Sequence, residues 1–190
     1  MSSGYWGAPI RLSIAKTNPI DSSVSTADTI HQMKALAIDA SRSPFISTLV
    51  NSLLINLPSH PSQTDIARDI YWWIKSHVTF VEDEQVLGSI LGYEDVAQEL
   101  LIPPVVLISM PSPSGDCDDF SMLAASCLLC AQIRCAFVTI AVDPETPERF
   151  SHVYVCALLD DKWMGFDTSH GQYLGWEYNG KVYRKVTWLI

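Results

Sequence analysis

An α+β fold is predicted by the order in which helical and strand patterns follow one another along the chain. In the first part of the chain, apolar residues recur at three- and four-residue steps, the period of amphipathic helices. From Cys135 onward, short runs that alternate between apolar and polar residues are typical of strands. Because helices come first and strands afterwards, we expect a mainly antiparallel sheet with the helices packed on it.

Three helices are expected before the central loop. The first begins near Asp28, and the second begins at Ser43, with Pro44 at its first helical position. The third begins with residues 62–65, Ser-Gln-Thr-Asp, because a serine followed three residues later by an acid forms a capping box. Between residues 82 and 110 the pattern predicts irregular and short helical pieces, followed by an apolar stretch whose type is open.

One domain with an N-terminal extension is predicted from composition. Residues 1–27 are rich in Ser and Thr and show no sustained hydrophobic period, so we expect an extended arm. Residues 28–190 form the expected domain. The full chain of 190 residues has 48% hydrophobic residues and six Trp, which is enough for a substantial core and argues against disorder.

A fourth helix is expected to begin at Cys117. The preceding loop, residues 111–115, reads Pro-Ser-Pro-Ser-Gly and cannot continue a helix or a sheet ladder. Asp116 can then act as the N-cap, with Asp119 as the acid of a capping box. The helix start favours a thiolate at Cys117, whereas the three neighbouring carboxylates oppose it.

A hairpin is expected to bring His152 and Asp167 together. His152 begins an alternating run to Leu158, and residues 163–167 form the return strand across Asp160-Asp161. If these two aspartates form a two-residue turn, Leu159 pairs with Lys162, and His152 and Asp167 become diagonal neighbours on one face. A three-residue turn would place them on opposite faces.

Two further strand elements complete the expected sheet. Residues 135–142 form an apolar strand that directly follows the cysteine helix. Residues 173–190 are expected to add a terminal hairpin, with its turn at residues 178–181, Tyr-Asn-Gly-Lys. The helix that begins at Cys117 is expected to pack on this sheet.

Charge and cysteine content exclude several classes of protein. The net charge of −9 disfavours nucleic acid and anionic membranes as partners, since both need clustered Lys and Arg. The sequence has no apolar stretch of the ~20 residues that a membrane span needs, and its start lacks a signal-peptide pattern, so we expect a cytoplasmic protein. Five cysteines, four of them in apolar runs, indicate reduced thiols, and the Cys127–Cys130 pair is interpreted as core rather than as a zinc or redox motif.

Three motifs in this order resemble the transglutaminase-like family of the papain-like cysteine protease superfamily, in its phage and bacterial form. They are residues 115–120, Gly-Asp-Cys-Asp-Asp-Phe, residues 151–155, Ser-His-Val-Tyr-Val, and residues 163–168, Trp-Met-Gly-Phe-Asp-Thr. Residues 70–80 also resemble the helix and short strand that precede the loop in that family. The resemblance covers roughly residues 62–170.

The resemblance implies a Cys-His-Asp triad that performs acyl transfer on amide bonds. Cys117 is then the nucleophile, His152 the base, and Asp167 the group that orients the imidazole. We expect a cysteine peptidase or amidase that hydrolyses a protein or peptide amide through a thioacyl-enzyme, with no cofactor and no metal. A phage origin would place the protein in the host cytoplasm or the virion.

Other interpretations stay open at this stage. The protein could retain the fold as a non-catalytic structural or virion-associated component, or it could transfer acyl groups to amines as a transglutaminase. Asp167 could cap the turn at residues 168–171, and His170 competes with His152 as a base. A metal site could draw on His and carboxylate groups, although their spacing matches no known motif. These groups are Asp116, Asp118, Asp119, His152, Asp167 and His170.

Overall fold

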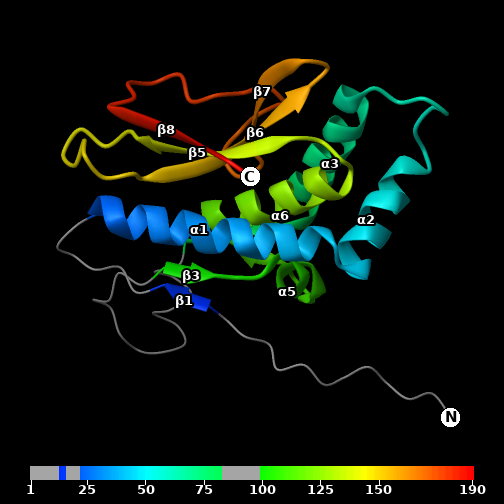
Figure 1. Cartoon of the computed structure of the whole chain (residues 1–190), viewed down its shortest axis with the longest axis horizontal. Coiled ribbons are helices and arrows are strands. Elements are labelled where there is room, and N and C mark those ends of the chain that lie inside the picture. The colour runs from blue at the N-terminus through cyan, green and yellow to red at the C-terminus, as the bar shows by residue number, and fades with distance from the viewer. Residues whose placement is uncertain (1–12, 16–21, 83–98) are drawn as a thin grey trace, which may run out of the picture.

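The computed structural model describes residues 13–15, 22–82 and 99–190 of the chain (Figure 1). The helices are α1 (Ser22–Ser41), α2 (Pro44–Leu54), α3 (Gln63–His77), α5 (Pro104–Ser109) and α6 (Cys117–Cys130). The strands of the main sheet are β5 (Cys135–Ala141), β6 (His152–Leu159), β7 (Lys162–Phe166) and β8 (Arg184–Leu189). Two short pairs are formed by β1 (Ser13–Ala15) with β3 (Glu99–Leu101), and by β2 (Thr79–Phe80) with β4 (Ser114–Gly115).

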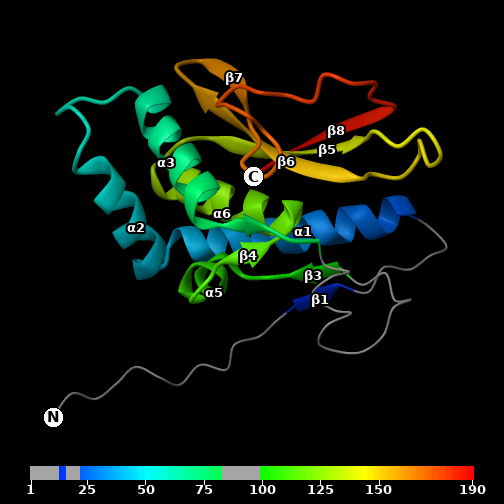
Figure 2. The ribbon, with the colours of Figure 1, turned by 180° about the vertical axis from the view of Figure 1, so that it is seen from behind.

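The main sheet is antiparallel throughout and has the order β7-β6-β5-β8. It lies along one side of the molecule, and the helices pack on one of its faces (Figures 1 and 2). Strand β6 alternates between the two faces, so that Val153, Val155 and Ala157 join the main core, whereas Tyr154 joins a smaller cluster on the other side. The expected α+β fold with a mainly antiparallel sheet is confirmed.

Helix α6 is the central element of the core. It contacts β5 and β6 of the sheet and also α1, α2, α3 and α5. Every residue from Asp118 to Leu128 is buried, which is unusual for a helix in a domain of this size and requires neighbours on all sides. The surrounding helices therefore fix both the axis of α6 and the place where its first residue lies.

The ends of the outer helices follow the signals in the sequence. Ser43 caps α2 by accepting a hydrogen bond from the Ile46 N–H, and Ser62 with Asp65 forms the capping box of α3. Helix α1 begins at Ser22 rather than near Asp28, because neither proline nor glycine interrupts the segment that precedes Asp28. The apolar stretch of open type is the short helix α5 with Pro104 as its first residue.

The β6–β7 hairpin has the two-residue turn on which the expected register depends. Asp160 and Asp161 have φ values of 48° and 66°, and Leu159 pairs with Lys162. Positive φ at both positions is the pattern of a type I′ turn, which matches the twist of the strands. The start of α3 supports the turn, since Thr64 donates to the Asp160 carboxylate at 2.6 Å.

The predicted terminal hairpin is wrong. Residues 171–183 form an irregular segment, and β8 alone pairs with β5 in antiparallel register. The other edge of β5 is occupied by β6, so β8 completes the backbone hydrogen bonds of β5 as a single returning strand. At the predicted turn, the Tyr178 ring folds against Gly180, where a Cβ atom would collide with it.

Most of the predicted N-terminal arm, residues 1–27, lies outside the described residues, and its role as an extension stays a prediction. Strand β1 is described and pairs with β3. None of the helices in the described ranges combines the length and the apolar character that a membrane-spanning segment needs.

Candidate active site

Cys117 is the first residue of α6, as the sequence predicts. Asp116 is the N-cap, and its carboxylate accepts the Asp118 N–H at 3.0 Å. Asp119 closes the capping box and also accepts the Ile102 N–H at 2.7 Å, a buried bond that ties the helix start to the segment after β3. The helix start is therefore rigidly held, and the N-terminal end of the helix dipole lies at the cysteine.

The third acid of this segment, Asp118, faces the sulfur. The residue is 4% exposed, and the Cys117 thiol donates to its Oδ1 at an Sγ–Oδ1 distance of 3.7 Å. Helix capping explains Asp116 and Asp119 but not this contact. The buried carboxylate favours the neutral thiol over the thiolate, in opposition to the helix dipole.

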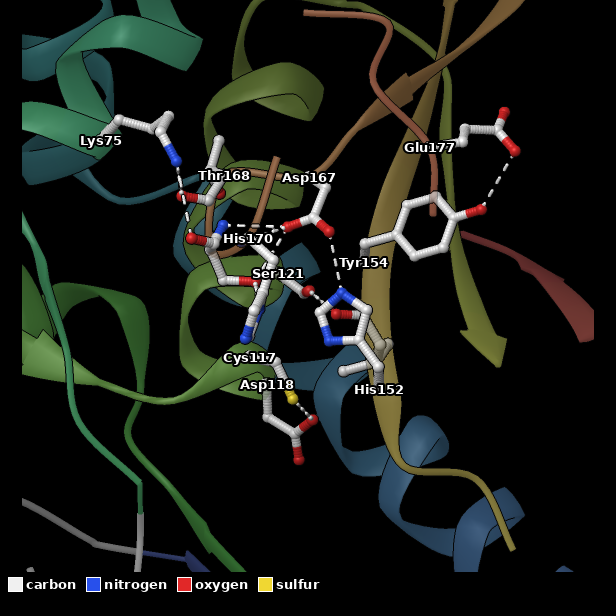
Figure 3. Close-up of polar contacts among 12 residues, drawn as sticks. Lys75, Cys117, Asp118, Ser121, His152, Tyr154, Asp167, Thr168, His170 and Glu177 are labelled. Atoms are coloured by element: carbon white, nitrogen blue, oxygen red, sulfur yellow. Dashed lines mark hydrogen bonds and ion pairs between the residues drawn. The ribbon is translucent and has the colours of Figure 1, made fainter. Parts of the chain in front are cut away.

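A buried hydrogen bond connects the helix of Cys117 to the strand of His152. The Ser121 hydroxyl, one helical turn after Cys117, donates to the Val153 carbonyl at 3.2 Å. Residues four apart lie on the same face of a helix, so the face that carries Cys117 is turned toward the start of β6. Figure 3 draws the Cys117 sulfur on the Nδ1 side of the His152 ring.

His152 and Asp167 are joined by a hydrogen bond of 2.8 Å between Nε2 and Oδ2. The register of the hairpin produces this contact. Val155 lies opposite Phe166, which places Asp167 just beyond β7 on the same face as His152. The His152 side chain is 12% exposed and that of Asp167 is 1% exposed, so the bond is largely shielded from water.

Asp167 is held as a carboxylate. Burial by itself would raise the pKa of Asp167, but the hydrogen bond and positive charge of His152 outweigh burial, and the donors of the next turn add to their effect. Those donors are the Ser169 N–H at 3.0 Å, the Ser169 hydroxyl at 2.9 Å and the His170 N–H at 2.9 Å, all to Oδ1. His152 and these donors together lower the pKa of Asp167 to about 2.

The ionised carboxylate fixes the tautomer of His152. A carboxylate can only accept hydrogen bonds, so Nε2 must carry the proton that Asp167 Oδ2 receives. In the neutral imidazole, Nδ1 is then the acceptor. Asp167 therefore caps the turn at residues 168–171 with one oxygen and orients His152 with the other, so the two interpretations of this residue are compatible (Figure 3).

Helix α3 contacts the turn at residues 168–171, a contact that the sequence did not predict. The Lys75 ammonium lies 3.5 Å from the carbonyl oxygens of Thr168 and Ser169. The Tyr71 hydroxyl is buried and would lie 2.9 Å from a Cβ atom placed on Gly171. Burial raises the pKa of Tyr71, and the negative charge of Asp167 raises it further. The only signal of this support in the sequence is that Tyr71 and Lys75 are four positions apart and so lie on one face of the helix.

His170 lies beside His152 on the exposed side of the site. The centroids of the two rings are 4.8 Å apart, and the rings are nearly perpendicular. The Phe80 ring also contacts the His170 ring, at a centroid distance of 4.7 Å. Its Nδ1 is 3.1 Å from the Ser169 hydroxyl. Burial against these groups lowers the pKa of His170, and the charge of His152 lowers it further.

Five of the six groups considered for a metal site fall into two sets, the second of which also includes Cys117. His152, Asp167 and His170 place one ligand atom each within 4.8 Å of one another, and Asp116, Cys117 and Asp118 do the same. Asp119 belongs to neither set, because its carboxylate is used in the capping box and on the Ile102 N–H.

The remaining cysteines are free thiols, and two of them, Cys127 and Cys135, are buried. Burial raises the pKa of both, and also that of Cys130 and Cys156. They are therefore poor nucleophiles at neutral pH. Cys127 and Cys130 pack in or against the main core, in agreement with the core interpretation of this pair.

No protein-family model and no curated protein sequence matches this chain. Among solved structures, a candidate protease from Parabacteroides distasonis ATCC 8503 is similar, with a TM-score of 0.50 and 14% identity, over 74% of this chain and 26% of that one. A candidate cysteine protease from Cytophaga hutchinsonii has a TM-score of 0.46 and 16% identity, over 82% of this chain and 46% of that one. A TGase has a TM-score of 0.40 and 15% identity, over 86% of this chain and 37% of that one.

The chain thus spans less than half of each of these three structures. At these identities the likeness concerns the fold alone. The α+β arrangement expected from the sequence is shared with the candidate protease from Parabacteroides distasonis.

Proposed function

We propose that this chain is a cysteine-dependent hydrolase of amide bonds, in which Cys117, His152 and Asp167 act as nucleophile, base and orienting group. The observation that carries the proposal is the shielded hydrogen bond of 2.8 Å between His152 and Asp167, in which the carboxylate leaves Nδ1 as the proton acceptor. A shielded His–carboxylate pair at the start of the strand that is hydrogen-bonded to the cysteine helix is an arrangement that can activate a thiol.

The reaction begins with proton transfer from the Cys117 thiol to His152 Nδ1. The thiolate attacks the amide carbonyl carbon, and the Cys117 backbone N–H, at the start of α6, donates to the developing oxyanion. As the C–N bond breaks, His152 returns the proton to the leaving amine. Asp167 stabilises the imidazolium in the interval but keeps its own charge.

Water then completes the reaction. It attacks the thioester carbonyl while His152 takes one of its protons, and the C–S bond breaks to release a carboxylic acid. The proton returns from His152 to the cysteine sulfur. The same thioester would yield a new amide if a primary amine replaced water, so amine transfer differs from hydrolysis only in the acceptor.

The substrate class follows from the fold likeness and the charge of the chain. The candidate protease from Parabacteroides distasonis, which is similar in fold, supports a protein substrate. We therefore assign a protein or peptide amide as substrate. With a net charge of −9, nucleic acid is disfavoured as a partner.

Site-resolved alkylation across pH, read by mass spectrometry, tests the proposal. Cys117 should react with iodoacetamide below pH 7, whereas the other four cysteines of the native chain serve as internal references. His152→Ala should abolish the fast reaction, and His60→Ala, at an exposed histidine, should leave it unchanged. A Cys117 that reacts no faster than the reference thiols, or only after unfolding, would overturn the proposal in favour of a structural role.

A second assay separates hydrolysis from transfer. The wild-type chain and Cys117→Ser are incubated with a peptide library and with a labelled primary amine, and products are analysed by mass spectrometry. Cleavage that depends on Cys117 supports the hydrolase. Cys117-dependent incorporation of the amine without cleavage would instead identify a transglutaminase.

A further inference from the structure

We propose that His152, Asp167 and His170 form a binding site for a borderline divalent cation such as Zn²⁺, and that occupancy of this site switches the catalytic base off. The inhibitory part rests on the proposed function, whereas the binding site stands on geometry alone. The three side chains come from two elements of the structure, β6 and the turn after β7, and Figure 3 draws His152 in contact with Asp167 and the His170 side chain nearby.

The donor set suits a borderline metal. Two imidazoles and one carboxylate are ligands that Zn²⁺ accepts, and the three ligand atoms already lie within 4.8 Å of one another. A tetrahedral ion with bonds of about 2.0–2.1 Å needs its ligand atoms roughly 3.3 Å apart. The 2.8 Å gap between His152 and Asp167 must therefore open by about 0.5 Å, while His170 moves inward.

Each ligand has a defined atom to offer. Asp167 Oδ1 already receives three hydrogen bonds from the following turn, so Oδ2 is the oxygen left for the metal. His170 Nδ1 contacts the Ser169 hydroxyl, so we assign Nε2 of that ring to the ion. The bonds to Oδ1 act as outer-shell support, because they hold the carboxylate in place when Oδ2 changes partner.

Metal binding reverses the tautomer of the base. A metal ion can bind His152 Nε2 only through its lone pair, so the proton on Nε2 must move to Nδ1. No proton is gained or lost by the neutral ring in this exchange. With Nδ1 protonated, His152 cannot accept the Cys117 proton, and acyl transfer stops until the ion leaves.

His170 is the residue that separates this site from an ordinary thiol–metal complex. The nucleophile itself is a soft ligand, and Asp116, Cys117 and Asp118 form the competing set. His170 is exposed, and it can be replaced without opening the core. Its removal should weaken metal binding at the proposed site and should leave the competing set intact.

Isothermal titration of the full chain with ZnCl₂ at pH 7 tests the site directly. The wild type should bind one ion, and His170→Ala and His170→Gln should each weaken binding by at least about tenfold, since even outer-shell partners of a metal contribute 10–100-fold. Cys117→Ser and His60→Ala should bind like the wild type. Circular dichroism verifies that each variant is folded.

Cobalt spectroscopy and alkylation complete the test. Co²⁺ at the proposed site should show ligand-field bands without thiolate charge-transfer absorption, and Zn²⁺ should slow Cys117 alkylation until EDTA is added. The proposal is overturned if the wild type binds no ion, or if Cys117→Ser abolishes binding that both His170 variants retain. A Cys117 that is activated but insensitive to Zn²⁺ overturns the switch alone, whereas Zn²⁺ binding to a chain with an unactivated Cys117 overturns the proposed function and keeps the site.

Discussion

The contact between Cys117 and Asp118 predicts that Asp118→Asn makes the Cys117 thiol more reactive at low pH. Asp118 is 4% exposed, and its Oδ1 lies 3.7 Å from the sulfur. A negative charge at this distance opposes the thiolate, and the thiol loses a hydrogen-bond acceptor when it ionises. Asparagine keeps the shape of the side chain, removes the charge and can donate an N–H to the thiolate.

The size of the effect follows from Coulomb's law. At 3.7 Å, two unit charges interact by about 1 kcal/mol in a medium like water and by about 4.5 kcal/mol at an effective dielectric constant of about 20. Because 1.36 kcal/mol corresponds to one pH unit, the pH midpoint of Cys117 alkylation should fall by about one to three units. The helix dipole contributes only about 0.3–1 kcal/mol at this position, so the change at Asp118 should dominate.

The assay is the rate of Cys117 alkylation between pH 4 and pH 10 in the native chain. Asp161→Asn is the matched control, because it makes the same chemical change in the exposed β6–β7 turn, at the far end of the hairpin from His152. A midpoint in Asp118→Asn that equals that of the control, or that lies above it, would refute the electrostatic reasoning.

Three further predictions concern stability. Folding lowers the pKa of Asp167 from 3.8 to about 2, which stabilises the folded chain by roughly 2 kcal/mol at any pH above the unfolded-state pKa. This stabilisation is lost as pH falls from about 5 to about 2. Urea titrations should show the loss in the wild type and not in Asp167→Asn. Asp161 has a φ of 66°, so Asp161→Gly should raise the melting temperature by about 1–2 °C and Asp161→Ala should lower it, as calorimetry can measure; equal effects of the two changes would contradict the turn assignment. Ser121→Ala removes the bond between α6 and β6 and should cost about 1 kcal/mol and slow Cys117 alkylation, whereas Ser126→Ala, which removes a bond within α6, should leave alkylation unchanged.

Local signals in the sequence determined the elements that carry the site. The capping box at Asp116 and Asp119 placed Cys117 at a helix start, because capping involves residues within one turn of each other. The two-residue turn and the strict alternation of strands put His152 and Asp167 on one face, since one register fixes every pair in a hairpin. The prediction of the expected fold class needed only the order of these patterns.

Tertiary structure decided what depends on distant segments. The pairing of β8 with β5 in place of a terminal hairpin was set by the edge that β5 leaves open, which short-range patterns do not encode. The support of the Asp167 turn by Lys75 on α3 joins residues more than 90 positions apart. Tertiary structure also decided which of the three acids at the helix start cap the helix and which one contacts the sulfur. Neighbouring carboxylates look alike in a sequence and differ only in the atoms that packing brings to them.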